Sequence, residues 1–223
     1  MPFIDAALTR YGQDGAAVTS NRNILFVHIQ KTGGTSILRT LGQEADLRHR
    51  HFFASQFRLM CTAEQWEATF KFAFVRNPWE RLVSWWSMMN SFRNAVPKGA
   101  QLNRFFTYVF ANSRTFEEFI LNCHADIEDP DGRKCILRNQ LDYLTDSKGR
   151  LLVDYVGKFE NLQTDFREVT RQLGLPDTAL ENINKSSHAA YTDYYNDRTR
   201  ALIERAYERD IAQFGYAFGK DAA

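Results

Sequence analysis

Residues 23–41, NILFVHIQKTGGTSILRTL, combine the side chains and the spacing of an anion-binding turn. Residues 24–29 are almost continuously apolar, which predicts a buried parallel strand, and residues 36–41 carry apolar side chains at helical spacing. Glycines between a strand and a helix let the backbone approach a ligand closely, and the first amides of the helix point at that ligand. The segment expected to bind an anion comprises Lys31, Thr32, Gly33, Gly34, Thr35 and Ser36. The alternative is a plain turn whose glycines only relieve strain.

A second cationic position follows another predicted strand. Residues 70–75, FKFAFV, have the pattern of a second buried strand, and Arg76 comes directly after them. A helix opens next, with a proline well placed in its first turn, and Ser84 lies along it. The guanidinium fork suits phosphate, and ligand sites in parallel sheets lie beyond the carboxyl ends of strands, so we expect Arg76 and residues 31–36 at one edge of the sheet. Alternatively, Arg76 caps a strand end and Ser84 bonds to its own helix backbone.

A histidine pair, His49 and His51, lies between these two segments. In a strand the two side chains would share a face. Three interpretations are open: a general base that removes the proton of an acceptor hydroxyl, a metal ligand for which no third ligand is evident, or ordinary loop histidines. His28, inside the first predicted strand, is expected to be a satisfied core residue or a residue behind the site.

The predicted elements alternate between strands and helices, which implies βαβ units in an α/β fold with a central parallel sheet flanked by helices on both faces. Strands are expected at residues 24–29, 70–75 and 151–159, with a short strand that ends in a loop at 45–53. Helices are expected at residues 36–41, 62–66, from 77 onward, and at 115–122, 160–173 and 197–214. Capping boxes at Thr62 and Thr115 and a helix stop at Gly174 support these bounds. Residues 91–114 interrupt the alternation of strands and helices and are expected to form an insertion or a lid-like loop.

Length and composition predict a single domain over residues 1–223, with a lead-in segment at 1–22. The formal net charge is +1, so nothing global indicates a nucleic-acid partner. No apolar run reaches the ~20 residues of a membrane span, and no signal-peptide pattern is present, so a cytoplasmic protein without an integral membrane segment is expected. The alternative is a catalytic domain cut from a secreted or membrane-anchored parent. The three cysteines form no pair with metal-ligand spacing, and no metal is expected.

Two motifs resemble a known family. HIQKTGGTSI at 28–37 and FVRNPWERLVSWW at 74–86 look like the nucleotide motifs of sulfotransferases that use 3′-phosphoadenosine-5′-phosphosulfate (PAPS). They are most similar to those of the carbohydrate group that contains the heparan sulfate 2-O and 6-O enzymes. DYVGKFENLQTDF at 154–166 and the segment 194–216 are similar to later parts of that group, so the resemblance spans most of residues 24–216.

The resemblance implies a P-loop-like fold and transfer of a sulfuryl group from PAPS to a hydroxyl, most readily that of a carbohydrate. It implies that Lys31 and the rest of the 31–36 segment hold the 5′-phosphosulfate, and that Arg76 and Ser84 hold the 3′-phosphate. It also favours His51 as the general base, with His49 in reserve. Lys185, in a segment only loosely like the family's closing segment, is a candidate phosphate contact.

Two other functions stay open. A small-molecule kinase would need a Walker-type G-x-x-x-x-G-K-[ST] loop, which the chain lacks, and a magnesium-binding Asp after residues 70–75, where Arg76 stands instead. A nucleotide-binding module without turnover would bind the donor and transfer nothing. The sequence is silent on the identity of the acceptor and on the oligomeric state.

Overall fold

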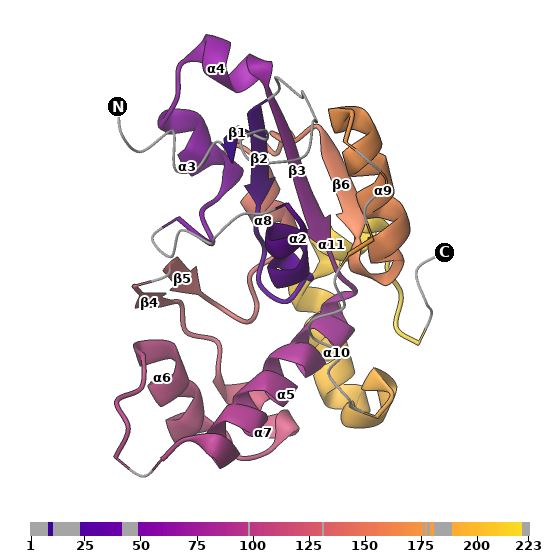
Figure 1. Cartoon of the computed structure of the whole chain (residues 1–223). Coiled ribbons are helices and arrows are strands. Elements are labelled where there is room, and N and C mark those ends of the chain that lie inside the picture. Colours follow the sequence, from indigo (N-terminus) through magenta and orange to yellow (C-terminus); the bar gives the residue numbers. More distant parts are fainter. Residues whose placement is uncertain are drawn as a thin grey trace. The chain divides into compact units, whose positions relative to one another are not determined.

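A four-stranded sheet organises one of the two units into which the chain divides, Met1–Val75 with Gln140–Asn184 (Figure 1). The structure is a computed structural model that describes residues 23–41, 49–97, 99–130, 132–175, 177, 179–180 and 189–219, and the backbone of residues 9–10. The sheet order is β1 (Thr9–Arg10), β2 (Asn23–Val27), β3 (Thr69–Val75) and β6 (Tyr155–Lys158). β2, β3 and β6 are parallel, as predicted, and β1 pairs antiparallel with β2.

The two faces of this sheet are covered differently. Phe70, Phe72 and Phe74 of β3 pack with α2 (Gly34–Thr40) and α9 (Leu162–Leu173), whose apolar side chains belong to the same buried cluster. Lys71 points the other way by strand alternation, and its Nζ lies 5.2 Å from the Trp66 ring centroid of α4 (Ala63–Ala68). Helices therefore flank a central parallel sheet, which confirms the predicted fold class.

Local signals set the bounds of several elements. Thr62 Oγ1 accepts a hydrogen bond from the Gln65 amide at 3.1 Å and Gln65 Oε1 accepts one from the Thr62 amide at 2.9 Å, which confirms the capping box before α4. α9 follows the short 3-10 turn Phe159–Asn161 and ends at Gly174, whose φ is 67°. The cap at Thr62 and the stop at Gly174 are at the predicted positions, and α9 begins at Leu162 rather than at the predicted residue 160.

Two predicted strands compare differently with the structure. For the segment 45–53, residues 45–48 lie outside the described part, and residues 49–53, where the segment is expected to end in a loop, form a turn that leads into α3 (Ala54–Leu59), with the Phe52 amide bonded to the His49 carbonyl at 3.1 Å. The strand expected at 151–159 is limited to β6 (Tyr155–Lys158). Residues 151–154 lie outside it, and the turn before them is organised by α8 (Gln140–Leu144) and an isolated bridge between Thr145 and Leu151.

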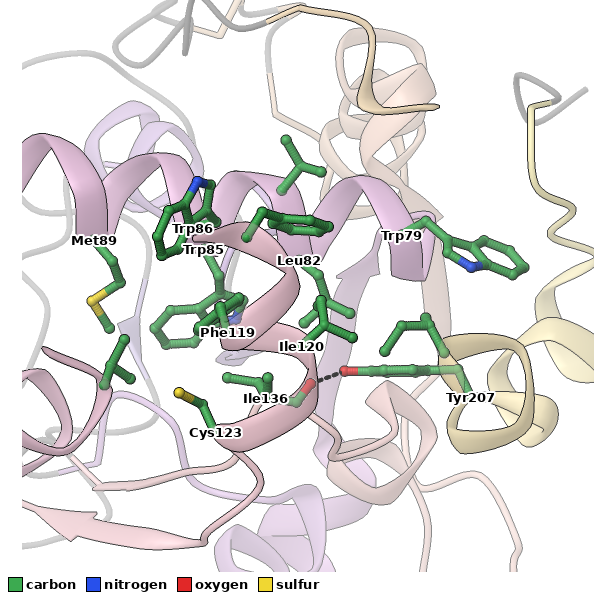
Figure 2. Close-up of a cluster of buried hydrophobic side chains, with 14 of the residues drawn as sticks. Trp79, Leu82, Trp85, Trp86, Met89, Phe119, Ile120, Cys123, Ile136 and Tyr207 are labelled. Atoms are coloured by element: carbon green, nitrogen blue, oxygen red, sulfur yellow. Dashed lines mark hydrogen bonds between the residues drawn. The ribbon is translucent and has the colours of Figure 1, made fainter. Parts of the chain in front are cut away.

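The other unit, Arg76–Asn139 with Lys185–Ala223, is mainly helical in its described part. Its elements are α5 (Pro78–Ala95), α6 (Arg104–Asn112), α7 (Phe116–Asn122), β4 (Ile127–Asp129), β5 (Gly132–Lys134), the 3-10 turn Tyr191–Tyr194, α10 (Asp197–Ala206) and α11 (Glu208–Phe214). Figure 2 shows its core, in which tryptophans of α5 pack against α7 and the Tyr207 hydroxyl donates to the Ile136 carbonyl.

Three expectations about this unit need correction. Residues 91–114 are not mainly a loop, because α5 runs through Ala95 and α6 occupies Arg104–Asn112. The β4–β5 hairpin after α7 lies where no strand is predicted. The final helix is two helices that meet at Tyr207, which is fully buried. The prediction of one domain over the whole chain stays a prediction, as does the lead-in role of residues 1–22, most of which lie outside the described residues.

Candidate functional site

The loop between β2 and α2 has an unusual backbone. Lys31 has φ 69° and is the one non-glycine residue with positive φ in the described part of the chain. Gly33, with φ 84°, precedes the first residue of α2. Left-handed backbone is unfavourable for a side chain such as lysine and persists only where the surroundings enforce it. One such restraint is internal to the loop, since the buried Thr32 hydroxyl donates to the Ile29 carbonyl at 2.9 Å.

Both loop glycines are required by close packing. A Cβ on Gly33 would lie 2.9 Å from Leu162 Cδ2, at the start of α9. A Cβ on Gly34 would lie 2.0 Å from Nε2 of His28. The glycines therefore do more than relieve strain, because they let the loop backbone lie directly against α9 and against a histidine ring.

His51 lies beside the start of this loop. Its side chain is buried, and its Nδ1 is 3.0 Å from the carbonyl oxygen of His28, three residues before Lys31. A carbonyl can only accept, so the neutral ring carries its proton on Nδ1 and keeps Nε2 as its basic nitrogen. His49 is half-buried and packs edge-on against Phe52, with ring centroids 4.8 Å apart. The His51 side chain is thus bonded to the loop backbone.

His28 is a neutral buried histidine between the loop and His51. Its ring stacks on Phe26 at 5.4 Å and lies 4.8 Å from the ring of His51. Burial lowers its pKa well below 6.5, and the nearby charges of His51 and Arg50 lower it further. Its Nδ1 has no hydrogen-bond partner among the described residues, so the expectation of a fully satisfied core histidine is wrong in that detail.

Arg76 and Ser84 lie in the helical unit, at the start and on the buried side of α5. Arg76, which follows Val75 in the sequence, is 4% exposed, and its Nη2 lies 2.8 Å from Glu80 Oε1. Asn77 caps α5 at the predicted start of this helix, with its Oδ1 accepting from the Trp79 amide at 3.1 Å. Ser84 is buried, one helical turn beyond Glu80. Arg76 thus already has one carboxylate partner, which any bound phosphate would share or displace.

The sequence analysis missed Gln30, within the loop, and Tyr143, which contacts it, as residues of the site. Tyr143 of α8 donates its hydroxyl to Gln30 Oε1 at 2.6 Å, and both side chains are buried. The Tyr143 ring also packs edge-on against Phe53 at 4.8 Å. Because 113 residues separate Gln30 from Tyr143, no local pattern signals this contact.

Other sequence candidates receive less support. Lys185 lies outside the described residues. The part of the chain that the structure covers contains no group of three His, Cys, Asp or Glu side chains arranged to hold a metal ion. None of the helices described combines the length and the apolar character of a membrane-spanning segment.

Comparison with known proteins gives one match. The model of the sulfotransferase family matches residues 14–217, which include most of both units. No curated protein and no solved structure matches the chain.

Proposed function

Because the chain belongs to the sulfotransferase family, we propose that it moves the sulfuryl group of PAPS to a hydroxyl of a carbohydrate. The observation that carries this proposal is the hydrogen bond from His51 to the backbone of His28. It brings a candidate base to the loop that contains Lys31, within a single unit of the molecule.

The roles of the donor-binding residues follow from their chemistry. We assign the 5′-phosphosulfate to residues 31–36, where the loop backbone and the Lys31 ammonium would face the transferring group. As the bond between sulfur and the phosphate oxygen breaks, negative charge grows on the leaving phosphate. A cation held in place stabilises that charge without reorganising during the reaction. Arg76 and Ser84 are assigned to the 3′-phosphate on the strength of their motif.

His51 is assigned to the acceptor hydroxyl. The hydroxyl oxygen forms the new bond to sulfur, and its proton passes to Nε2 of His51. The hydrogen bond at Nδ1 supports this role because it fixes the ring and presents Nε2 as the acceptor. His49, whose ring packs edge-on against Phe52, remains the reserve candidate.

A transfer assay tests the donor and the acceptor class together. The protein is incubated with sulfur-labelled PAPS and, separately, with a desulfated glycosaminoglycan, a simple alcohol and a phenol, all in excess chelator. We expect label in the polysaccharide without added divalent metal. Label only in the phenol would contradict the carbohydrate assignment. In a parallel incubation with labelled ATP and magnesium, transfer would favour a kinase. Nucleotide binding without transfer to any acceptor would favour a binding module.

Nucleotide affinity tests the 3′-phosphate assignment separately. Calorimetry should give far tighter binding of 3′-phosphoadenosine 5′-phosphate than of adenosine monophosphate. Arg76→Ala should weaken binding of the former by about 2–4 kcal/mol, the scale of truncating one partner of a buried charged pair. Equal affinity of the wild-type protein for both nucleotides would contradict the assignment.

A further inference from the structure

The left-handed backbone at Lys31 needs an anchor outside its own loop. The bond from Thr32 to Ile29 lies within the loop and moves with it. Gln30, the residue before Lys31, has its side chain fixed from elsewhere by the hydroxyl of Tyr143, at 2.6 Å. A hydrogen bond between two buried groups is expensive to leave unmade, so this contact restrains the backbone on the N-terminal side of Lys31.

The same tyrosine contacts the segment that carries His51. Its ring lies 4.8 Å from that of Phe53, which is two residues after His51 and caps α3. The Tyr143 hydroxyl therefore bonds to the residue next to Lys31, and the Tyr143 ring packs against a residue close to His51. All these residues belong to one unit, so their mutual geometry is defined by the contacts just described.

We propose that Tyr143 is a positioning residue that fixes the segments of Lys31 and His51 in register for sulfuryl transfer. This inference rests on the proposed function, since it takes Lys31 and His51 as the groups that act on donor and acceptor. Small displacements of reacting groups reduce rates strongly, and a ~1 Å misplacement can lower a rate by ~10²-fold. Tyr143 would act through the two segments and need touch neither substrate.

The variant Tyr143→Phe separates the two contacts. It removes the hydroxyl that holds Gln30 and keeps the ring that packs on Phe53. We expect kcat to fall about tenfold while the acceptor KM changes little, because the loss falls on alignment rather than on binding. Amide hydrogen exchange in a peptide spanning residues 28–34 should become faster in the free protein.

Tyr207→Phe is the matched control. Tyr207 is also fully buried, and its hydroxyl also donates within a core, but to the Ile136 carbonyl in the other unit. This variant should lose stability and leave kcat and exchange in residues 28–34 unchanged. Gln30→Met gives a second route to the same defect, and combining it with Tyr143→Phe should reduce kcat no further than either change alone.

Several outcomes would overturn the inference. These are a wild-type kcat for Tyr143→Phe, an equal loss in Tyr207→Phe, or losses that multiply in the double variant with Gln30→Met. The proposed function fails differently. Suppose that the wild-type protein transfers no sulfuryl group while Tyr143→Phe still speeds amide exchange in residues 28–34. Tyr143 would then restrain the loop as proposed, and the proposed sulfuryl transfer would be wrong.

Discussion

Buried polar side chains serve different ends in the two units of the molecule. In the sheet-containing unit, Gln30, Thr32, His51 and Tyr143 all bond to, or within, one short segment before α2. In the helical unit, buried polar groups instead connect separate helices and strands to one another. Burial of polar groups therefore does not by itself mark a site. Convergence on a backbone held in an unfavourable conformation is the better indicator.

The helical unit offers two examples of the connecting kind. Arg81 is fully buried, and its Nη1 lies 3.0 Å from the hydroxyl of Tyr207, which itself donates to Ile136. Asp129 of β4 accepts from the Arg104 amide at 2.9 Å and pairs with Lys134 at 3.0 Å. The first links α5 to the junction of α10 and α11, and the second holds the β4–β5 hairpin to the start of α6.

The largest expected effect is on turnover and comes from the sheet-containing unit. His51→Ala should reduce kcat by about 10²–10⁴-fold, the usual contribution of a general base, with nucleotide affinity nearly unchanged. The measurement is single-turnover transfer at saturating PAPS, with calorimetry of 3′-phosphoadenosine 5′-phosphate in parallel. His49→Ala is the control and should show the smaller loss. A normal rate for His51→Ala with a slow His49→Ala would reverse the assignment.

Stability, not turnover, should respond most in the helical unit. Asp129→Ala leaves the buried Lys134 ammonium without its carboxylate and removes the acceptor at the start of α6. The free energy of unfolding should fall by about 3–5 kcal/mol, as measured by urea denaturation. Replacing both partners, as Asp129→Leu with Lys134→Met, should recover much of this loss. A single variant within about 1 kcal/mol of wild type would show that the pair contributes little.

A smaller effect should distinguish the glycines of the sheet-containing unit. Gly34→Ala forces a methyl group into the His28 ring and should lower the free energy of unfolding by about 1–3 kcal/mol, the usual range for overpacking. Turnover should also fall, because His28 carries the carbonyl that orients His51. Gly174→Ala is the control, since its Cβ would meet open space. It should lose about 1 kcal/mol through its left-handed backbone alone and keep its kcat.

The smallest expected effect is a loss of folding stability that is absent at neutral pH and appears only in acid. The pKa of His28 is lowered in the folded protein, so above about pH 6.5 the ring is neutral in both the folded and the unfolded state. Below that pH the His28 imidazole is protonated in the unfolded chain but stays neutral in the folded protein. The free energy of unfolding should then fall by up to about 1.4 kcal/mol per pH unit until the folded pKa is reached. The stability difference between wild type and His28→Gln should therefore change between pH 7.5 and pH 5.5. A difference that stays constant would contradict this prediction.

Local patterns account for what the sequence could predict. β2, the loop, α2, the start of α5 at Asn77 and the end of α9 at Gly174 each follow from apolar periodicity or from a cap within a few residues. The β4–β5 hairpin has no counterpart in the sequence prediction, since contacts with another element help to hold it: Asp129 of β4 accepts a hydrogen bond from the Arg104 amide. α6 was missed although it has a local cap, since Asn103 Oδ1 accepts from the Phe106 amide at 2.8 Å; its first amides also bond to Asp129 from another element.

The candidate site divides in the same way. The anion loop, Arg76 and Ser84 could be named from their motifs, and their roles stay predictions. The bond between His51 and the His28 backbone spans 23 residues, and that between Tyr143 and Gln30 spans 113, so neither has a signature in the sequence. A single sequence does not show which residues, distant along the chain, hold a motif in its active conformation.

The two-residue strand β1 matters for handling the protein. Thr9 and Arg10 pair with Ile24 and Asn23 and so shield part of the outer edge of β2. A shortened protein that starts at residue 22 would lack β1. The backbone groups of the apolar strand β2 that pair with β1 would then be unpaired. Unpaired edges of this kind recruit strands from other chains, so such a truncation should favour aggregates during expression and crystallisation. Residues ahead of the anion loop are therefore worth retaining even where they contribute nothing to binding.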